Sequence, residues 1–286
     1  MQEVKNMKKH TLNGKFQKDS LMFLVIIGLW LLLVLYFDPK ILTYVNEQES
    51  LLVRISIFCF VVLLDLFWLY GIYHLVISLF SVFCKTPSIL FDNISVARPK
   101  VAILYTTKND FKEKAVVSCI NQDYDNFDVY ILDDSTDVGI LSRIDEFISK
   151  IPGHLFLIRR DSKEGFKAGN LNHALKIIYD KYDYFAVSDA DGLLPKDFIK
   201  RLLPYFSIND SVGFVQANQR STPQQKSVFA KDLSLNTDLH WKCYLPAKNY
   251  FGFVMFYGHG ALIRTGVPRL KTVPLKWYKS QGGGDG

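Results

Sequence analysis

Two long apolar stretches near the start of the chain constrain its fold more than any other feature. The first, residues 21–37, contains no charged residue, and as a helix it is long enough to cross most of a bilayer's hydrocarbon core. The second, residues 55–83, is interrupted only by Asp65 and His74. A soluble core helix of this composition would need an apolar partner on every face. We therefore predict two transmembrane helices within residues 21–83, the second with an interfacial continuation.

The charges that flank these stretches predict how the chain crosses the membrane. Five lysines precede the first stretch, whereas the connecting segment carries only Lys40 and Arg54 against three carboxylates. By the positive-inside rule, residues 1–20 form a cytoplasmic tail, and two spans return the chain to the cytoplasm. A cleaved signal peptide is the rival interpretation, but no small-residue cleavage site follows Phe37. We expect a multi-pass protein of the cell (inner) membrane with a cytoplasmic soluble domain.

The composition excludes several other classes of protein. The formal net charge of +6 comes largely from the lysines that flank the apolar stretches. It therefore indicates contact with anionic lipid and sets topology, and it does not indicate nucleic acid. The four cysteines are scattered, without the paired spacing of a zinc site or a redox couple.

After Pro99 the sequence alternates short apolar runs with segments of helical spacing. Four such runs end in polar residues, namely 101–104, 129–132, 155–158 and 184–187. Fully apolar strands separated by helices are typical of a parallel sheet that is covered on both faces. Because ligands bind beyond the carboxyl ends of such strands, the polar residues that follow the runs should line one crevice. This predicts an α/β domain after Pro99.

The segment "YFAVSDADGLLP", residues 184–195, places two carboxylates directly after one of these runs. On a strand, side chains two residues apart lie on the same face, so Asp189 and Asp191 could meet one cation. Hard oxygen donors suit Mg²⁺ or Mn²⁺, and a nucleotide diphosphate would supply further oxygens. An exposed acidic turn is the structural alternative, because D-x-D is a common tripeptide.

A different chemistry for this segment uses the first aspartate as a nucleophile. "DADGL" resembles the motif of haloacid-dehalogenase-like phosphatases, with Leu193 where that family has threonine or valine. That family opens its domain with the motif, whereas here the motif follows the fourth apolar run. We therefore set the phosphatase interpretation behind the metal-binding one.

Three motifs together resemble family 2 glycosyltransferases, most closely the cellulose synthase- and hyaluronan synthase-like branch. They are "VYILDDS" at 129–135, "GFKAGNLNHAL" at 165–175 and "VSDADGLLP" at 187–195. The resemblance covers about residues 97–266 and implies a GT-A (Rossmann-like) fold with a mostly parallel sheet. It also implies transfer of a sugar from a nucleotide sugar, usually a UDP-sugar, to a saccharide or lipid-linked acceptor with inversion.

The same resemblance assigns roles to particular residues. It places Thr106 and Asp134, or its neighbour Asp133, against the uridine. Lys167 of "KAGN" would lie against the nucleotide with Asp189 nearby. The implied cofactor is a divalent metal, Mg²⁺ or Mn²⁺, which the aspartates of "DADG" would carry.

Two residues are candidates for the acceptor side of the site, and each has a structural role as the alternative. Trp241 would stack on a sugar face or be a packed aromatic, and His259 would be an acceptor-site residue or a hydrogen-bonded structural one. Members of this branch continue into an acidic T/S-E-D motif whose aspartate is the general base, and the sequence after Arg264 does not follow that pattern. We expect residues 267–286 to be an irregular, truncated tail, and the catalytic base is not identified. A catalytically incomplete nucleotide-sugar-binding remnant, or a partner subunit, is the alternative function.

Overall fold

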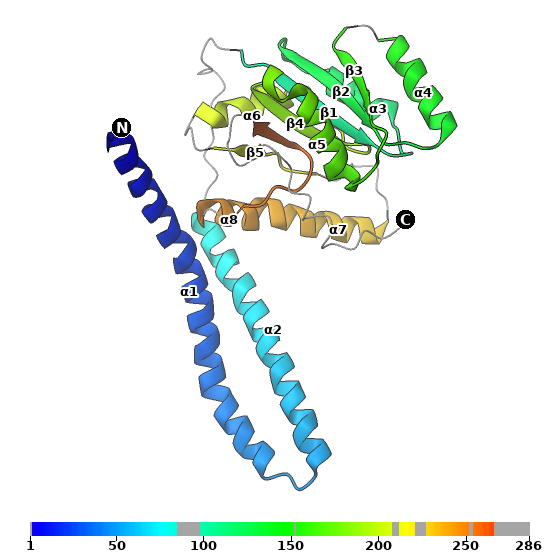
Figure 1. Ribbon diagram of the computed structural model, residues 1–286. Coiled ribbons are helices and arrows are strands. Elements are labelled where there is room, and N and C mark those ends of the chain that lie inside the picture. The colour runs from blue at the N-terminus through cyan, green and yellow to red at the C-terminus, as the bar shows by residue number, and fades with distance from the viewer. Residues whose placement is uncertain are drawn as a thin grey trace. The chain divides into compact units, whose positions relative to one another are not determined.

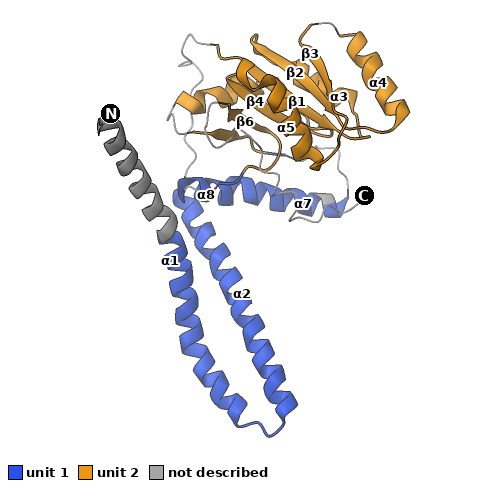
Figure 2. Cartoon of the chain, in the orientation of Figure 1, with its two compact units in different colours: residues 1–87, 219–255 blue, residues 88–218, 256–286 orange. Residues whose placement is uncertain are grey.

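The computed structural model shows a helical part and an α/β part (Figure 1). It describes residues 2–84, 98–151, 153–207, 212–220, 227–251 and 254–265, with the backbone alone for 2–20 and 230. The chain divides into two compact units, unit 1 with residues 1–87 and 219–255 and unit 2 with residues 88–218 and 256–286 (Figure 2). The predicted tail, residues 267–286, lies outside the described residues.

Two long helices, α1 (Gln2–Asn46) and α2 (Leu51–Phe83), pack against each other in unit 1. From Leu21 onward, both are long and apolar enough to cross a membrane, by length and composition. Most of their large apolar side chains, such as Leu35 and Phe67, are exposed. A helix in a soluble core would bury these side chains, so their exposure fits an apolar solvent. The two apolar helices that the sequence predicts are therefore present.

The connection between these helices is shorter than the sequence suggested. Helix α1 continues past Phe37, with Pro39 inside it, and ends only at Asn46. Val45 is buried, so the last turns of α1 still have an apolar face to pack. The Thr43 hydroxyl donates to the Pro39 carbonyl oxygen at 2.8 Å, a common bond between a helical threonine and the carbonyl oxygen four residues before it.

Unit 1 also contains a segment from the second half of the chain. Helix α7 (Val228–Leu239), the π-helical turn η4 (His240–Tyr244) and helix α8 (Leu245–Phe251) follow one another. Ala247 and Phe251 of α8 share an apolar cluster with Met22 of α1 and Ile77 of α2. The predicted domain, residues 97–266, is thus divided between the two units, and its boundaries stay a prediction.

Unit 2 is built on a six-stranded sheet with the order β3-β2-β1-β4-β6-β5. The strands are β1 (Val101–Thr107), β2 (Phe127–Asp133), β3 (Leu155–Arg159), β4 (Tyr184–Asp189), β5 (Phe214–Gln216) and β6 (Ala261–Arg264). The first four are parallel, whereas β6 runs antiparallel to β4 and to β5. This confirms the predicted α/β fold with a mostly parallel sheet.

Helices cover both faces of this sheet (Figure 1). They are α3 (Glu113–Ile120), α4 (Val138–Ser149), α5 (Phe166–Ile178) and α6 (Phe198–Leu202). Alternate residues of β1 enter two different cores: Ile103 packs with residues of α3, α4 and α6, and Leu104 packs with residues of α5. Because both faces are buried, β1 is apolar without alternation until Thr106, which is the pattern the sequence showed.

Candidate functional site

The carboxyl ends of β1, β2 and β4 meet at one edge of the sheet. In the strand register, Thr106 of β1 is opposite Asp189 of β4, and Thr107 of β1 is opposite Asp133 of β2. All three strands run in the same direction, so their last residues lie together. The polar residues that the sequence placed after separate apolar runs are therefore neighbours.

Three of the predicted residues contact the Asp189 carboxylate. The Lys167 ammonium forms an ion pair with Asp189 Oδ1 and donates to the Gly258 carbonyl oxygen at 3.0 Å. His259 Nδ1 lies 3.3 Å from Asp189 Oδ2, and Thr106 Oγ1 lies 3.4 Å from Oδ1. The site is a partly buried carboxylate with an ammonium, an imidazole and a hydroxyl around it.

Glycines shape the backbone that carries these side chains. Gly165, the residue before α5, has φ of 72°, a left-handed conformation that brings the chain into the helix just before Lys167. His259 lies between Gly258 and Gly260, whose φ values are 86° and 63°. The Gly260 N–H donates to the Val187 carbonyl oxygen at 2.8 Å, which fixes this turn against β4.

Asp134 is held by a buried arginine. Arg160 Nε and Nη2 donate to the two carboxylate oxygens of Asp134 at 2.8 and 2.5 Å, and each side chain is only 6% exposed. The same guanidinium donates to the carbonyl oxygens of Glu164 and Phe166. Asp134 therefore fixes, through Arg160, the loop that leads into α5 and Lys167.

Asp133 is the more deeply buried of the two neighbouring aspartates, with a side chain that is 0% exposed. Its Oδ1 accepts from the Ser135 N–H, and its Oδ2 accepts from Arg159 Nε, both at 2.8 Å. Burial disfavours the charge on Arg159, but the ion pairs with Asp133 and Asp145 outweigh it and raise the pKa of Arg159. Both carboxylates are thus paired with arginines of the adjacent segment.

Asp191 is placed differently from the expectation. Strand β4 ends at Asp189, and the Gly192 N–H closes a turn by donating to the Asp189 carbonyl oxygen at 3.0 Å. The side-chain alternation of a strand therefore does not extend to Asp191, which is exposed in this turn. The prediction that both aspartates project from one strand face was wrong in this respect.

The carboxylates at this edge of the sheet suit a metal ion whose other ligands are phosphate oxygens of a bound nucleotide. Within the described ranges, no three His, Cys, Asp or Glu side chains converge on one point. Mg²⁺ and Mn²⁺ prefer carboxylate oxygens, and Mg²⁺ commonly binds through one or two carboxylates plus substrate phosphates. The partly buried Asp189 and the exposed Asp191 supply carboxylate oxygens of this kind, and in that second arrangement a nucleotide would complete the coordination.

Trp241 belongs to unit 1, where it lies in η4. It is 9% exposed, and its ring packs edge-on against His240. This is the packed aromatic that the sequence left as the alternative. Its acceptor role stays a prediction.

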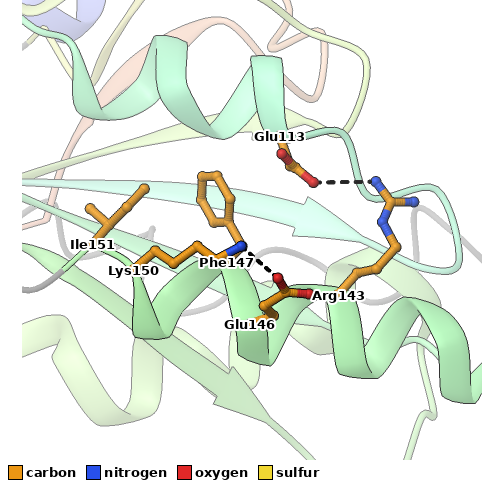
Figure 3. Close-up of a pocket in the computed structure, with 6 residues that line it drawn as sticks. All are labelled: Glu113, Arg143, Glu146, Phe147, Lys150 and Ile151. Atoms are coloured by element: carbon orange, nitrogen blue, oxygen red, sulfur yellow. Dashed lines mark hydrogen bonds and ion pairs between the residues drawn. The ribbon is translucent and has the colours of Figure 1, made fainter.

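A hollow of about 340 Å³ lies elsewhere, between α3 and α4 (Figure 3). It is lined by Glu113, Arg143, Glu146, Phe147, Lys150 and Ile151. Its charges pair with one another, Arg143 with Glu113 and Lys150 with Glu146. It contains none of the residues that the motifs predict, so the strand ends remain the candidate site.

The chain matches the sequence profile of Glycosyl transferase family 2 over residues 102–266. This match covers more than half of the 286 residues, and it includes all three motifs and every residue around Asp189. The protein belongs to glycosyl transferase family 2. The family that the motifs predict is thereby confirmed.

Curated plant proteins are among the relatives. The chain is 30% identical over 146 residues to "Probable glucomannan 4-beta-mannosyltransferase 7" of Oryza sativa subsp. japonica, covering 49% of this chain and 25% of that protein. It is 28% identical over 184 residues to "Glucomannan 4-beta-mannosyltransferase 9" of Arabidopsis thaliana, covering 58% of this chain and 34% of that protein. The chain thus spans a quarter to a third of the length of these relatives.

Among solved structures, the chain is similar to the mannosyltransferase PcManGT from Pyrobaculum calidifontis in complex with GDP-Man and Mn²⁺. The identity is 20%, the TM-score is 0.49, and the alignment covers 69% of this chain and 55% of that one.

Proposed function

We propose that this protein is a membrane-anchored glycosyltransferase that binds a nucleotide sugar and a divalent metal at the carboxyl ends of β1, β2 and β4. The observation that supports this most is the cluster around Asp189. It joins the end of β4, the start of α5 and the turn before β6, all within the segment that matches the family. Charged groups of both signs at one sheet edge suit a ligand that carries a diphosphate and a metal.

Each residue of the cluster has a role in this proposal. Lys167 binds the diphosphate, and its ammonium neutralises part of the charge that develops on the leaving nucleotide. Thr106 and Asp134 lie toward the nucleoside, Asp134 being oriented by Arg160. Asp189 and Asp191 hold the metal, which when bound neutralises further charge on the phosphate oxygens.

The donor in this proposal is a UDP-sugar, and the acceptor is a saccharide or a lipid-linked saccharide. The anomeric carbon is inverted, as the family resemblance implies. The plant relatives are named as glucomannan mannosyltransferases, which supports a polysaccharide acceptor and a hexose as the transferred group. These names do not specify the nucleotide that carries the hexose, so the binding experiments compare GDP with UDP.

The membrane topology is part of the same proposal. Helices α1 and α2 span the inner membrane, the N-terminus is cytoplasmic, and unit 2 lies in the cytoplasm. The exposed apolar side chains of both helices support membrane insertion, and the lysines before Leu21 support the orientation.

A nucleotide-sugar-binding subunit without transferase activity is the second candidate. It differs from the enzyme in turnover and not in binding, since both would hold the nucleotide sugar at the ends of β1, β2 and β4. Membership of family 2 removes the support for the phosphatase interpretation.

Substitution of Asp191 by alanine tests the proposed binding site. We expect the chain to bind UDP more tightly with Mn²⁺ than without it, and Asp191→Ala to weaken the Mn²⁺-dependent binding at least about tenfold. Calorimetric titration of UDP and of GDP, each with and without Mn²⁺, measures this. Asp123→Ala is the matched control, because Asp123 is an exposed carboxylate that pairs with Lys200.

The outcome separates the candidates. Equal nucleotide binding by the wild type and Asp191→Ala would contradict the proposed metal site. If binding behaves as expected, incubation with a labelled nucleotide sugar then distinguishes the two functions. Transfer or hydrolysis of the sugar supports the enzyme, and binding without turnover supports the subunit.

A further inference from the structure

We propose that the Lys167 ammonium holds the cation position on Asp189 until a nucleotide binds, so that the metal and the nucleotide diphosphate bind cooperatively. The inference rests on the proposed function, because it concerns the same site. It adds an order to the binding: a metal without the nucleotide has to compete with a side chain of the protein.

The first observation is that both oxygens of the Asp189 carboxylate are engaged. Oδ1 is in contact with the Lys167 ammonium and lies 3.4 Å from Thr106 Oγ1. Oδ2 lies 3.3 Å from His259 Nδ1. A divalent ion needs at least one of these oxygens as a ligand. On Oδ1 it would lie directly beside the Lys167 ammonium, and on Oδ2 beside the His259 imidazole.

The second observation is that Lys167 is well held at this position. Its ammonium has a second acceptor, the Gly258 carbonyl oxygen at 3.0 Å, and its side chain is 22% exposed. Its backbone lies in the first turn of α5, and the loop before that helix is fixed by Arg160. A metal that binds without a nucleotide would therefore have to displace the Lys167 ammonium from Asp189 Oδ1 and the Gly258 carbonyl oxygen, or bind close to its positive charge.

The nucleotide changes this balance. A divalent ion on Asp189 would lie within a few ångströms of the ammonium, and like charges at that distance repel strongly. A diphosphate supplies new negative oxygens, and lysine can reach them because its ammonium has three donors on a flexible stem. The Asp189 oxygen is then open to the metal. Since coupling of two ligands is reciprocal, each ligand should raise the affinity of the other by the same factor.

Binding of Mn²⁺ without nucleotide tests the first half of the proposal. The free Mn²⁺ signal in electron paramagnetic resonance is titrated against the 286-residue chain in detergent. Lys167→Met should bind Mn²⁺ at least about tenfold more tightly than the wild type, a typical coupling factor. Lys167→Arg, which keeps the charge, and Lys200→Met, which removes an exposed lysine of the same unit, should resemble the wild type.

Addition of UDP or GDP tests the second half. In the wild type, the nucleotide should tighten Mn²⁺ binding about tenfold or more. In Lys167→Met this gain should be smaller, because only the part that comes from the diphosphate oxygens as metal ligands remains. Lys167→Gln repeats the test with a neutral side chain that can still donate to the Gly258 carbonyl oxygen. Circular dichroism checks that the variants remain folded.

The results also separate this inference from the proposed function. If neither neutral variant binds Mn²⁺ more tightly than the wild type, Lys167 does not hold the cation position and the inference is wrong. If the neutral variants do bind Mn²⁺ more tightly but neither the wild type nor any variant binds a nucleotide, Lys167 does hold the cation position, and the cooperative half of the inference fails together with the proposed function.

Discussion

Replacing Gly169 by alanine will destabilise unit 2 and abolish nucleotide binding, although alanine is the better helix former. A Cβ at this position of α5 would lie 1.9 Å from the Glu164 carbonyl oxygen and 2.6 Å from Arg160 Nη1. The Glu164 carbonyl oxygen cannot move without breaking the hydrogen bond that Arg160 donates to it. We expect a loss of about 3 kcal/mol, typical of a severe overpacking, and a fall of roughly 6–12 °C in the melting temperature.

Gly71→Ala is the matched control for this prediction. Gly71 is also helical, and within the described part of the chain no heavy atom lies within 4 Å of a Cβ added there. Its stability should be unchanged or raised by up to about 1 kcal/mol, because alanine has the higher helix propensity. Thermal unfolding of both variants measures the difference. A Gly169→Ala protein as stable as Gly71→Ala would show that the Glu164 carbonyl oxygen does not lie against Gly169.

Removing the Arg160 guanidinium should have an effect of similar size for a different reason. Arg160→Met leaves the Asp134 carboxylate buried without its partner, and breaking a buried pair in this way costs about 3–5 kcal/mol. The loop that leads to Lys167 loses the hydrogen bonds that Arg160 donates to its carbonyl oxygens, so nucleotide affinity should fall as well. Thermal unfolding and calorimetry measure the two effects.

Two further variants isolate the buried charge as the cause. Arg160→Met combined with Asp134→Asn removes both charges and should recover part of the lost stability. Lys150→Met breaks an exposed pair with Glu146 on α4, and because water screens such a pair, the stability should stay close to that of the wild type. If Arg160→Met were as mild as Lys150→Met, Asp134 and Arg160 would not be the buried pair that positions α5.

The sequence predicts the parallel part of the sheet well because a strand that is buried on both faces has a continuous run of apolar residues. Strands β1, β2 and β4 contain the continuous apolar runs 101–104, 129–132 and 184–187, and polar residues follow each run toward the carboxyl end of the strand. Strands β5 and β6 have only three and four residues. Runs this short have no period that distinguishes them from loops, so the antiparallel end of the sheet was missed.

The pairing of side chains is harder to predict than their convergence. The motifs place Asp134 and Asp189 at one edge, but which cation meets which carboxylate depends on strand neighbours and loop paths. Arg160 reaches Asp134 because β3 lies beside β2. His259 reaches Asp189 because β6 returns beside β4, 70 residues later in the chain. No local pattern in the sequence contains that information.

The central claim is that the nucleotide binds at the ends of β1, β2 and β4. Photoaffinity labelling with an azido derivative of UDP or GDP in the presence of Mn²⁺ tests it most directly. The label should fall on peptides that contain residues 106–110, 133–136 or 160–170, and excess unmodified nucleotide should prevent it. Specific labelling of residues 143–151, which line the hollow between α3 and α4, or of α1 and α2, would contradict the account.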